Sequence, residues 1–278
     1  MAEKFIPIND LTLAYREANS DKKKVILFIH GNSGSSRMWQ KQFVSDTLDN
    51  YRLIAVDLPG HGKSSTSKRP EEDYSPIGTA KILSYVLNKL APDEPFVLVG
   101  FSYGTNLIAE MLPHHINPAG LVLLGPCVLG ENYGIEKVFV PRPTPSIFLY
   151  NEPNRNAVEN FLNDSIDPKN RQDLLNSIED YLNVDPLFKP TIFQTATEGK
   201  ITDEIKNLYE LDKEVCLMFG AKDNLINIDY LDTQPFRIWK NKICKIEGAG
   251  HWANIDKAEI FNKVLIEYTK EMLEANHV

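Results

Sequence analysis

The sequence has few cysteines, no long apolar run and no excess of positive charge. Its three cysteines, Cys127, Cys216 and Cys244, form no CxxC pair and stand at unrelated spacings. This pattern argues against both a disulfide framework and a zinc site. No stretch approaches the roughly 18 apolar residues of a membrane-spanning helix, and the N-terminal segment lacks the apolar core of a secretory signal. We therefore expect a cytoplasmic protein that is not embedded in a membrane.

The charge balance is acidic, with a formal net charge of -8 over 278 residues. Such a chain is a poor match for nucleic acid or anionic lipid. The glycines after Asp57 match neither GxxxxGK[ST] nor GxGxxG, so they predict no phosphate-binding loop. The pair His114-His115 lacks a third ligand at metal spacing. The sequence predicts neither a cofactor nor a metal, and it leaves the oligomeric state open.

Apolar runs recur along the chain at intervals typical of an α/β protein. Two short antiparallel strands are expected near residues 5–9 and 11–17. They precede continuous apolar runs of the kind that forms strands buried on both faces, at 25–30, 53–57, 96–101, 121–124, 215–219 and 243–246. Helical patterns lie between them, at 76–90, 106–112 and 258–273. This alternation predicts a mostly parallel sheet with helices on both faces.

One long segment interrupts the alternation. Between residues 127 and 211 no buried-strand run occurs, and a proline-rich piece at 140–145 is followed by amphipathic helical patterns. A structureless loop of this length would be improbable. We therefore predict a helical cap at 127–211, inserted into a core formed by residues 1–126 and 212–278.

The motif Gly100-Phe101-Ser102-Tyr103-Gly104 follows a Val-Leu-Val strand and opens a helix. In the GxSxG motif, the serine between the two glycines is a nucleophile that lies in a strained turn between a strand and a helix. The glycines on both sides relieve clashes with the neighbouring backbone. The pattern predicts that Ser102 is a nucleophile. A serine hydroxyl needs a neighbouring base, because it is a weak nucleophile at its free pKa.

His251 is the expected base, since it follows the last strand in the flexible segment Gly248-Ala249-Gly250. The acid that orients it should follow the preceding strand, where Asp223 stands. Glu131, after the strand at 121–124, is the alternative acid.

Backbone donors for a developing oxyanion are expected at two places. The loop His30-Gly31-Asn32-Ser33-Gly34 follows the first buried strand, and its Asn32 N–H can join the N–H of Tyr103. His30 and His61 are expected to be packed, hydrogen-bonded residues.

Together, the His-Gly loop, the Asp57-Leu58-Pro59-Gly60-His61-Gly62-Lys63-Ser64 segment, the serine elbow and the Asp223/His251 pair resemble the α/β-hydrolase superfamily. The resemblance implies an α/β-hydrolase fold, with an eight-stranded mostly parallel sheet and a helical cap between the sixth and seventh strands. It also implies a carboxylic ester or lactone hydrolase that works through an acyl-enzyme.

Within the superfamily, the segments at 30–33, 51–64 and 248–251 are similar to the metal-independent N-acyl-homoserine-lactone lactonases. That likeness implies a small ester or lactone substrate bordered by Asn32. Asp223 stands where those enzymes have glutamate, and Phe161 falls on or near a cap tyrosine that contacts the lactone. We expect Phe161 and Trp252 to contact substrate. Other cap side chains could line an acyl pocket, namely Phe139, Phe148, Tyr150, Leu162 and Leu187.

Three alternatives stay open at this point. Carbon–carbon bond hydrolases use the same triad, although their oxyanion loop is usually richer in glycine. Proline iminopeptidases need acidic cap residues, for which Glu152, Glu159 and Asp164 are available. Some proteins keep this fold as a non-catalytic binding module.

Overall fold

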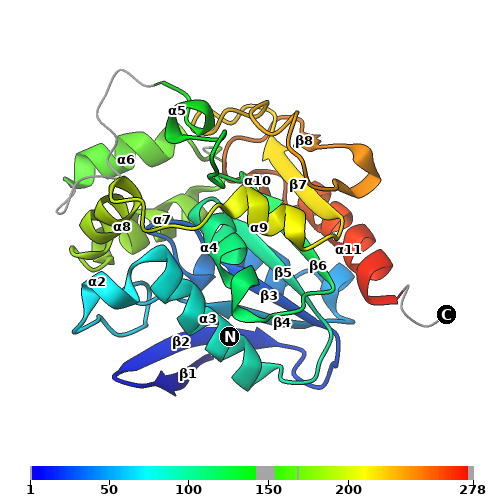
Figure 1. Cartoon of the computed structure of the whole chain (residues 1–278), viewed down its shortest axis with the longest axis horizontal. Helices are drawn as coiled ribbons and strands as arrows, with labels where there is room; N and C mark the ends of the chain where they lie inside the picture. The colour runs from blue at the N-terminus through cyan, green and yellow to red at the C-terminus, as the bar shows by residue number, and fades with distance from the viewer. Residues whose placement is uncertain (1, 142–153, 168, 275–278) are drawn as a thin grey trace.

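The computed structural model describes residues 2–141, 154–167 and 169–274, and an eight-stranded sheet runs through it (Figure 1). The strand order is β1-β2-β4-β3-β5-β6-β7-β8. β1 and β2 pair antiparallel, β2 is antiparallel to β4, and the other strands are parallel. The strands are β1 Glu3–Ile8, β2 Leu11–Ala18, β3 Val25–Ile29, β4 Arg52–Val56, β5 Phe96–Phe101, β6 Gly120–Leu124, β7 Val215–Gly220 and β8 Cys244–Ile246. The predicted α/β-hydrolase fold is confirmed.

The central strands are apolar throughout because both faces of the sheet are covered. Along β3, Leu27 and Ile29 belong to the core on one face, and Ile26 and Phe28 belong to the core on the other. All four are essentially inaccessible to solvent. The continuous apolar run at this strand therefore follows from burial on two sides rather than one.

Helices cover each face of this sheet. α3 and α4 contribute to one core and α11 to the other. The predicted helix at 76–90 coincides with α3, whose N-cap Ser75 accepts a hydrogen bond from the Gly78 N–H. The core helices are α1 Gln40–Phe43, α2 Pro70–Asp73, α3 Pro76–Leu90, α4 Tyr103–Met111, α10 Ala253–Asp256 and α11 Ala258–Glu274, with 3₁₀ turns at Ser36–Trp39, Asp46–Leu48, Leu112–His114 and Trp239–Asn241. Within the described residues, no helix has both the length and the hydropathy needed to cross a bilayer.

The segment between β6 and β7, which we call the insertion, is helical where it is described. Its helices are α5 Ile135–Val138, α6 Arg155–Asn163, α7 Arg171–Asn183, α8 Phe188–Thr197 and α9 Glu204–Glu210. Figure 1 shows α6, α7 and α8 grouped at the upper left, whereas α9 lies beside α4. Two contacts hold α9 there: Asn106 Nδ2 donates to Glu204 at 2.7 Å, and Asn207 Nδ2 donates to the Ala109 carbonyl at 3.1 Å. The domain limits at 127 and 211 remain a prediction.

The topology brings separate loops to one edge of the sheet. β3, β5, β6, β7 and β8 are parallel neighbours, so their carboxyl ends meet at the same edge. Ligands of open α/β sheets bind at that edge. Asn32, Ser102, Asp223 and His251 each follow one of these strands.

Candidate active site

Ser102 lies in the turn between β5 and α4. Its backbone has φ 50° and ψ −123°, a conformation that a residue with a side chain rarely adopts. The turn is fixed by hydrogen bonds from the Ser102 N–H to the Leu124 carbonyl, at 2.9 Å, and from Thr105 to the Ser102 carbonyl. Backbone strain that persists because its surroundings hold it is typical of functional sites.

The flanking glycines explain how this turn fits against its neighbours. A Cβ on Gly104 would lie 2.5 Å from the Ile29 carbonyl oxygen, and one on Gly100 would lie 2.7 Å from the Gly104 carbonyl oxygen. Both contacts are with backbone carbonyl oxygens, so a side chain at either position would force the backbone to move. Glycine is therefore required two residues before and two residues after Ser102 for steric reasons, as the motif predicted.

The structure brings His251 and Asp223 into direct contact. Nδ1 of His251 lies 2.6 Å from Oδ2 of Asp223, and both side chains are buried. The other carboxylate oxygen accepts the N–H groups of Leu225, at 2.9 Å, and Ile226, at 3.0 Å. Burial raises the pKa of Asp223, but the charge and hydrogen bond of His251 and the two N–H groups outweigh it, so the pKa lies below its usual value. Asp223 is thus held as a carboxylate.

The imidazole of His251 rests over the ends of two central strands. Its ring centre lies 4.7 Å from that of Phe101, the residue before Ser102. Gly125, just after β6, leaves room for it, because a Cβ there would lie 2.8 Å from Cε1 of His251. The alternative acid, Glu131, is exposed, and its N–H points to Asp203 instead.

Cys127 is a buried thiol near Ser102. No hydrogen bond joins Ser102 to His251 within the described residues. Burial and the charge of Glu204 raise the pKa of Cys127, while hydrogen bonds from the Thr105 and Ser102 hydroxyls oppose the rise. A hydrogen bond between a catalytic serine and its base is often long or poorly aligned until substrate binds.

The loop His30-Gly31-Asn32-Ser33-Gly34 packs directly against the elbow. A Cβ on Gly31 would lie 3.1 Å from both the Phe101 carbonyl oxygen and Cβ of Ser102. Asn32 is half-buried, and its side chain accepts a hydrogen bond from the Ser33 hydroxyl. The Asn32 and Tyr103 N–H groups find no acceptor in the part of the chain that the structure describes. An oxyanion site requires free donors of this kind beside the nucleophile.

His30, at the start of this loop, and His61, in the segment after β4, are buried and hydrogen-bonded, as expected. Nε2 of His61 accepts the Ser33 N–H at 3.3 Å, and Nε2 of His30 accepts the Leu58 N–H at 3.0 Å. Their Nδ1 atoms face the carbonyls of Pro59 and Gly31. Burial lowers the pKa of both rings. Each ring is therefore neutral, with its proton on Nδ1.

Aromatic side chains of the insertion contact both the neighbour of the nucleophile and the neighbour of the base. Ring centres lie 5.9 Å apart for Tyr103 and Phe188, 6.1 Å for Tyr181 and Phe161, and 6.1 Å for Phe161 and Trp252. Trp252 in turn lies 5.1 Å from His251. The predicted substrate residues Phe161 and Trp252 are thus brought together beside the base.

The other predicted pocket residues are distributed differently. Leu162 is buried in the core, whereas Phe139 and Leu187 are 38% and 51% exposed. Leu187 precedes α8 and points outward because Phe188 takes the inner position. Phe148 and Tyr150 lie outside the described residues, as does Glu152. Of the insertion carboxylates, Glu159 pairs with Arg155 at 2.7 Å on the surface, and Asp164 is exposed.

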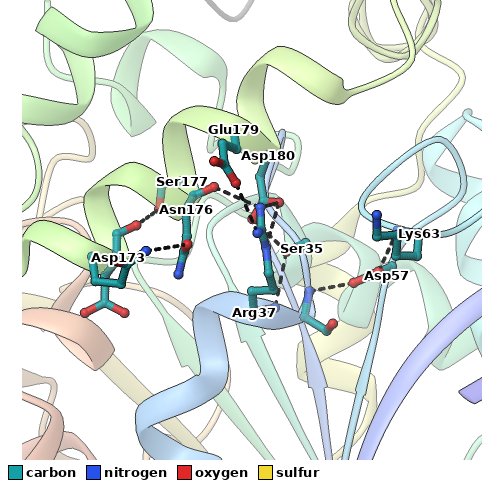
Figure 2. Close-up of polar contacts among 11 residues, drawn as sticks. Ser35, Arg37, Asp57, Lys63, Asp173, Asn176, Ser177, Glu179 and Asp180 are labelled. Carbon is teal, nitrogen blue, oxygen red and sulfur yellow. Dashed lines mark hydrogen bonds and ion pairs between the residues drawn. The ribbon is translucent and has the colours of Figure 1, made fainter. Parts of the chain in front are cut away.

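A polar cluster that the sequence did not reveal fastens the insertion beside the oxyanion loop (Figure 2). Asp180 of α7 accepts hydrogen bonds from the Ser35 hydroxyl at 2.6 Å and from Arg37. Asp57 accepts the Ser36 N–H at 2.6 Å and the Lys63 N–H at 2.9 Å. The partners are up to 145 positions apart in the sequence, which is why no local pattern signals them.

A second carboxylate, that of Asp256, connects the insertion to the core at the loop that carries His251. One oxygen of Asp256 accepts the Gly250 N–H at 3.0 Å, and the other accepts the Asp167 N–H at 2.9 Å. Asp256 therefore joins the histidine loop to the insertion.

Comparison with known proteins agrees with this architecture. Residues 24–258 match the family model described as alpha/beta hydrolase fold. The chain is 22% identical to a 2-hydroxy-6-oxo-6-phenylhexa-2,4-dienoate hydrolase of Comamonas testosteroni, over 95% of this chain and 93% of that protein. Many relatives of this kind are hydrolases, and this chain is a hydrolytic enzyme.

Solved structures give the same result for the fold. The N-acyl homoserine lactonase AidH, complexed with N-butanoyl homoserine, superposes with a TM-score of 0.89 at 20% identity over the whole of both chains. The esterase RhEst1 from Rhodococcus sp. reaches 0.80 at 23% identity, over 98% of this chain and 100% of that one. The match over residues 24–258, the sheet order and the elbow agree, and the chain belongs to the alpha/beta hydrolase fold family.

Proposed function

We propose that the protein is a serine hydrolase that cleaves a small carboxylic ester or lactone through an acyl-enzyme. The observation that carries the proposal is the 2.6 Å contact between His251 Nδ1 and Asp223 Oδ2, beside the strained turn of Ser102. An acceptor at Nδ1 fixes the tautomer in which Nε2 is free to take a proton.

In the first half of the reaction, Oγ of Ser102 attacks the carbonyl carbon while Nε2 of His251 removes the hydroxyl proton. The carbonyl oxygen becomes an oxyanion, which the N–H groups of Asn32 and Tyr103 stabilise. Collapse of this intermediate breaks the bond to the alcohol oxygen, and His251 returns the proton to it. With a lactone, the released hydroxyl stays attached to the acyl group.

In the second half, water attacks the acyl-enzyme. His251 removes a proton from the water, the same donors stabilise the second oxyanion, and the proton passes to Ser102 as the acid leaves. Asp223 stays ionised and stabilises the imidazolium that forms in each half. Its lowered pKa suits this role.

The substrate class rests on the surroundings of Ser102. The aromatic side chains of Tyr103, Phe161, Phe188 and Trp252 favour an apolar acyl or alkoxy group. A carbon–carbon bond hydrolase is the second candidate, because curated relatives with that kind of name align over 93–95% of this chain. A cytoplasmic location is part of the proposal, and the three free cysteines are in keeping with it.

The nucleophile can be tested by active-site labelling. A fluorophosphonate should modify Ser102 alone, as located by peptide mass spectrometry, and Ser102→Ala should lower kcat for p-nitrophenyl butyrate by at least about 10³-fold. Ser45→Ala, at a half-buried serine whose hydroxyl contacts Thr47, is the matched control and should retain the wild-type rate. A Ser102→Ala enzyme with wild-type kcat would overturn the assignment.

The bond type can be tested with a substrate panel. It should contain butanoyl and hexanoyl homoserine lactones, p-nitrophenyl esters, a vinylogous diketone acid and proline p-nitroanilide. Lactone opening is followed by proton release. We expect kcat/KM for the esters or lactones to exceed that for the diketone at least tenfold. Turnover of the diketone alone would establish the carbon–carbon hydrolase instead.

A further inference from the structure

Lys189 is a buried lysine with no counter-ion. It is the second residue of α8, and only 2% of its surface is exposed. Its Nζ has no hydrogen-bond partner within the described residues. The contact that it does make is with an aromatic face, since Nζ lies 4.0 Å from the ring centre of Tyr181.

This placement is energetically unfavourable for the protein alone. Burying an ammonium without a partner is costly, and a cation–π contact offsets only part of that cost. Other lysines close to the insertion have anionic or carbonyl partners: Lys41, for example, contacts Asp173 at 3.3 Å and the Ile255 carbonyl at 2.8 Å. The folded protein would be more stable with an apolar side chain at position 189. We therefore expect the ammonium group to bind an anion that is not part of the described chain.

The neighbours of Lys189 connect it to the candidate active site on two sides. The preceding residue, Phe188, packs on Tyr103 and lies 4.3 Å from His61, ring centre to ring centre. His61 holds the Ser33 N–H in the oxyanion loop. On its other side, Tyr181 leads through Phe161 to Trp252 and the base. Lys189 thus lies between Phe188, which contacts Tyr103 beside the nucleophile, and Tyr181, which leads to Trp252 beside the base.

We propose that Lys189 binds a carboxylate carried by the substrate, on the opposite end from the carbonyl group that Ser102 attacks. This proposal rests on the proposed function and narrows its substrate class to esters or lactones of dicarboxylic acids, or to their equivalents with one free carboxylate. One ammonium group among the aromatic side chains of Tyr181 and Phe188 matches one negative charge, whereas a phosphate dianion would need further donors.

The electrostatics of the lysine agree with this role. Burial alone lowers the pKa of Lys189 to about 8, with no acid of the described chain opposing the shift. The ammonium is therefore charged at neutral pH, and a bound carboxylate would stabilise it further.

A matched pair of esters tests the proposal. p-Nitrophenyl hydrogen glutarate and p-nitrophenyl valerate have the same chain length and differ in the terminal group. Lys189→Met should lower the ratio of kcat/KM for the glutarate to that for the valerate at least tenfold, mainly through KM. Lys206→Met removes an exposed lysine from α9 and should leave the ratio unchanged. An unchanged ratio in Lys189→Met would overturn the proposal.

Binding without turnover separates this proposal from the proposed function. In wild-type or Ser102→Ala protein, glutarate should bind at pH 7 at least tenfold more tightly than glutaramide, as measured by calorimetry, and the preference should vanish at pH 9.5. Equal affinities at pH 7 would refute carboxylate binding even if the esters are hydrolysed. A wild-type rate in Ser102→Ala would refute the serine mechanism while leaving this measurement valid. The result does not depend on whether Lys189→Met folds.

Discussion

The guanidinium of Arg37 donates two hydrogen bonds to one carboxylate oxygen of Asp180, from Nε at 3.2 Å and from Nη2 at 2.5 Å. Arg37 lies just after the oxyanion loop, and Asp180 lies in α7 of the insertion (Figure 2). The second oxygen of Asp180 accepts the Ser35 hydroxyl. The pair therefore connects the core to the insertion next to the place where the oxyanion is expected.

Removing the charge of Asp180 should weaken this connection. Burial raises the pKa of Asp180 against the opposing effects of Arg37 and Ser35, which shows that the carboxylate depends on these partners. We expect Asp180→Asn to lower the free energy of unfolding by about 1–3 kcal/mol, since Asp180 is buried and Arg37 only partly so. Urea unfolding measures the change.

Glu179→Gln is the control for this prediction. Glu179 meets the same arginine at 3.3 Å, but its side chain is 58% exposed, so its loss should cost less than about 0.5 kcal/mol. Equal losses in the two variants would contradict the role given to Asp180. Limited proteolysis should cut the insertion faster in Asp180→Asn than in Glu179→Gln.

The acid of the proposed triad gives a second prediction. Asp223→Asn keeps the shape of the side chain but cannot hold the imidazole in the required tautomer. We expect kcat to fall by about 10⁴-fold, as in related Ser-His-Asp sites. Glu131→Gln, at the exposed alternative acid, should keep kcat within about twofold. A large loss in Glu131→Gln together with a small loss in Asp223→Asn would move the acid to the loop after β6.

The sequence predicted the strands of the core and the contact between Asp223 and His251 because both have local signatures. The apolar runs gave six strands, and an antiparallel pair was expected before them; every strand end lies within two residues of its prediction. Ser75 before Pro76 marked the start of α3. Ser102, Asp223 and His251 each follow a strand, so chain order and strand position sufficed to single them out.

The contacts of the insertion could not be predicted in this way. The bonds of Asp180 to Ser35 and Arg37 span more than 140 residues, and Asp256 meets Asp167 across 89. Lys189 looks like any polar residue of an amphipathic helix, and its burial depends on how α8 packs against Tyr181 and His61. Nor could the sequence show that Leu187 faces solvent while its neighbour Phe188 is buried.

Gly31 supplies a third prediction, about the position of the oxyanion loop. A Cβ there would lie 3.0 Å from Cδ1 of Phe101 and 3.1 Å from both the Phe101 oxygen and Cβ of Ser102. The elbow is too constrained to yield, so Gly31→Ala should displace the loop by a few tenths of an ångström. Because catalysis is sensitive to such shifts, we expect kcat to fall about tenfold with KM little changed.

The matched control is Gly34→Ala in the same loop. The nearest atoms to a Cβ at Gly34 are at 3.4 Å, which is ordinary contact, and the variant should keep kcat within about twofold. If the two variants have the same kcat, the close approach of Gly31 to the elbow does not determine the position of the oxyanion loop.

The last prediction concerns acid stability. His30 and His61 are buried and neutral, because each ring donates through Nδ1 to a carbonyl and accepts a backbone N–H through Nε2. Burial, followed by the charge of His30, lowers the pKa of His61 well below its usual value. When the pH falls below about 6.5, the unfolded chain takes up a proton on this residue and the folded chain does not. The free energy of unfolding due to His61 is therefore fully present above about pH 6.5 and is lost progressively as the pH falls toward the folded-state pKa.

Buried carboxyls act in the opposite direction, so the effect must be isolated by substitution. Burial raises the pKa of Glu110 and Glu204, and the folded chain keeps their protons to higher pH than the unfolded chain. We therefore compare urea unfolding at pH 7.5 and 5.5. Wild type should lose about 1 kcal/mol more than His61→Gln over this interval, because one site that protonates only on unfolding contributes about 1.4 kcal/mol per pH unit below 6.5. His115→Asn, at an exposed histidine, should follow wild type. If His61→Gln shows the same pH dependence as wild type, His61 is protonated in the folded protein, and its hydrogen bond to the Ser33 N–H cannot have the direction assigned to it.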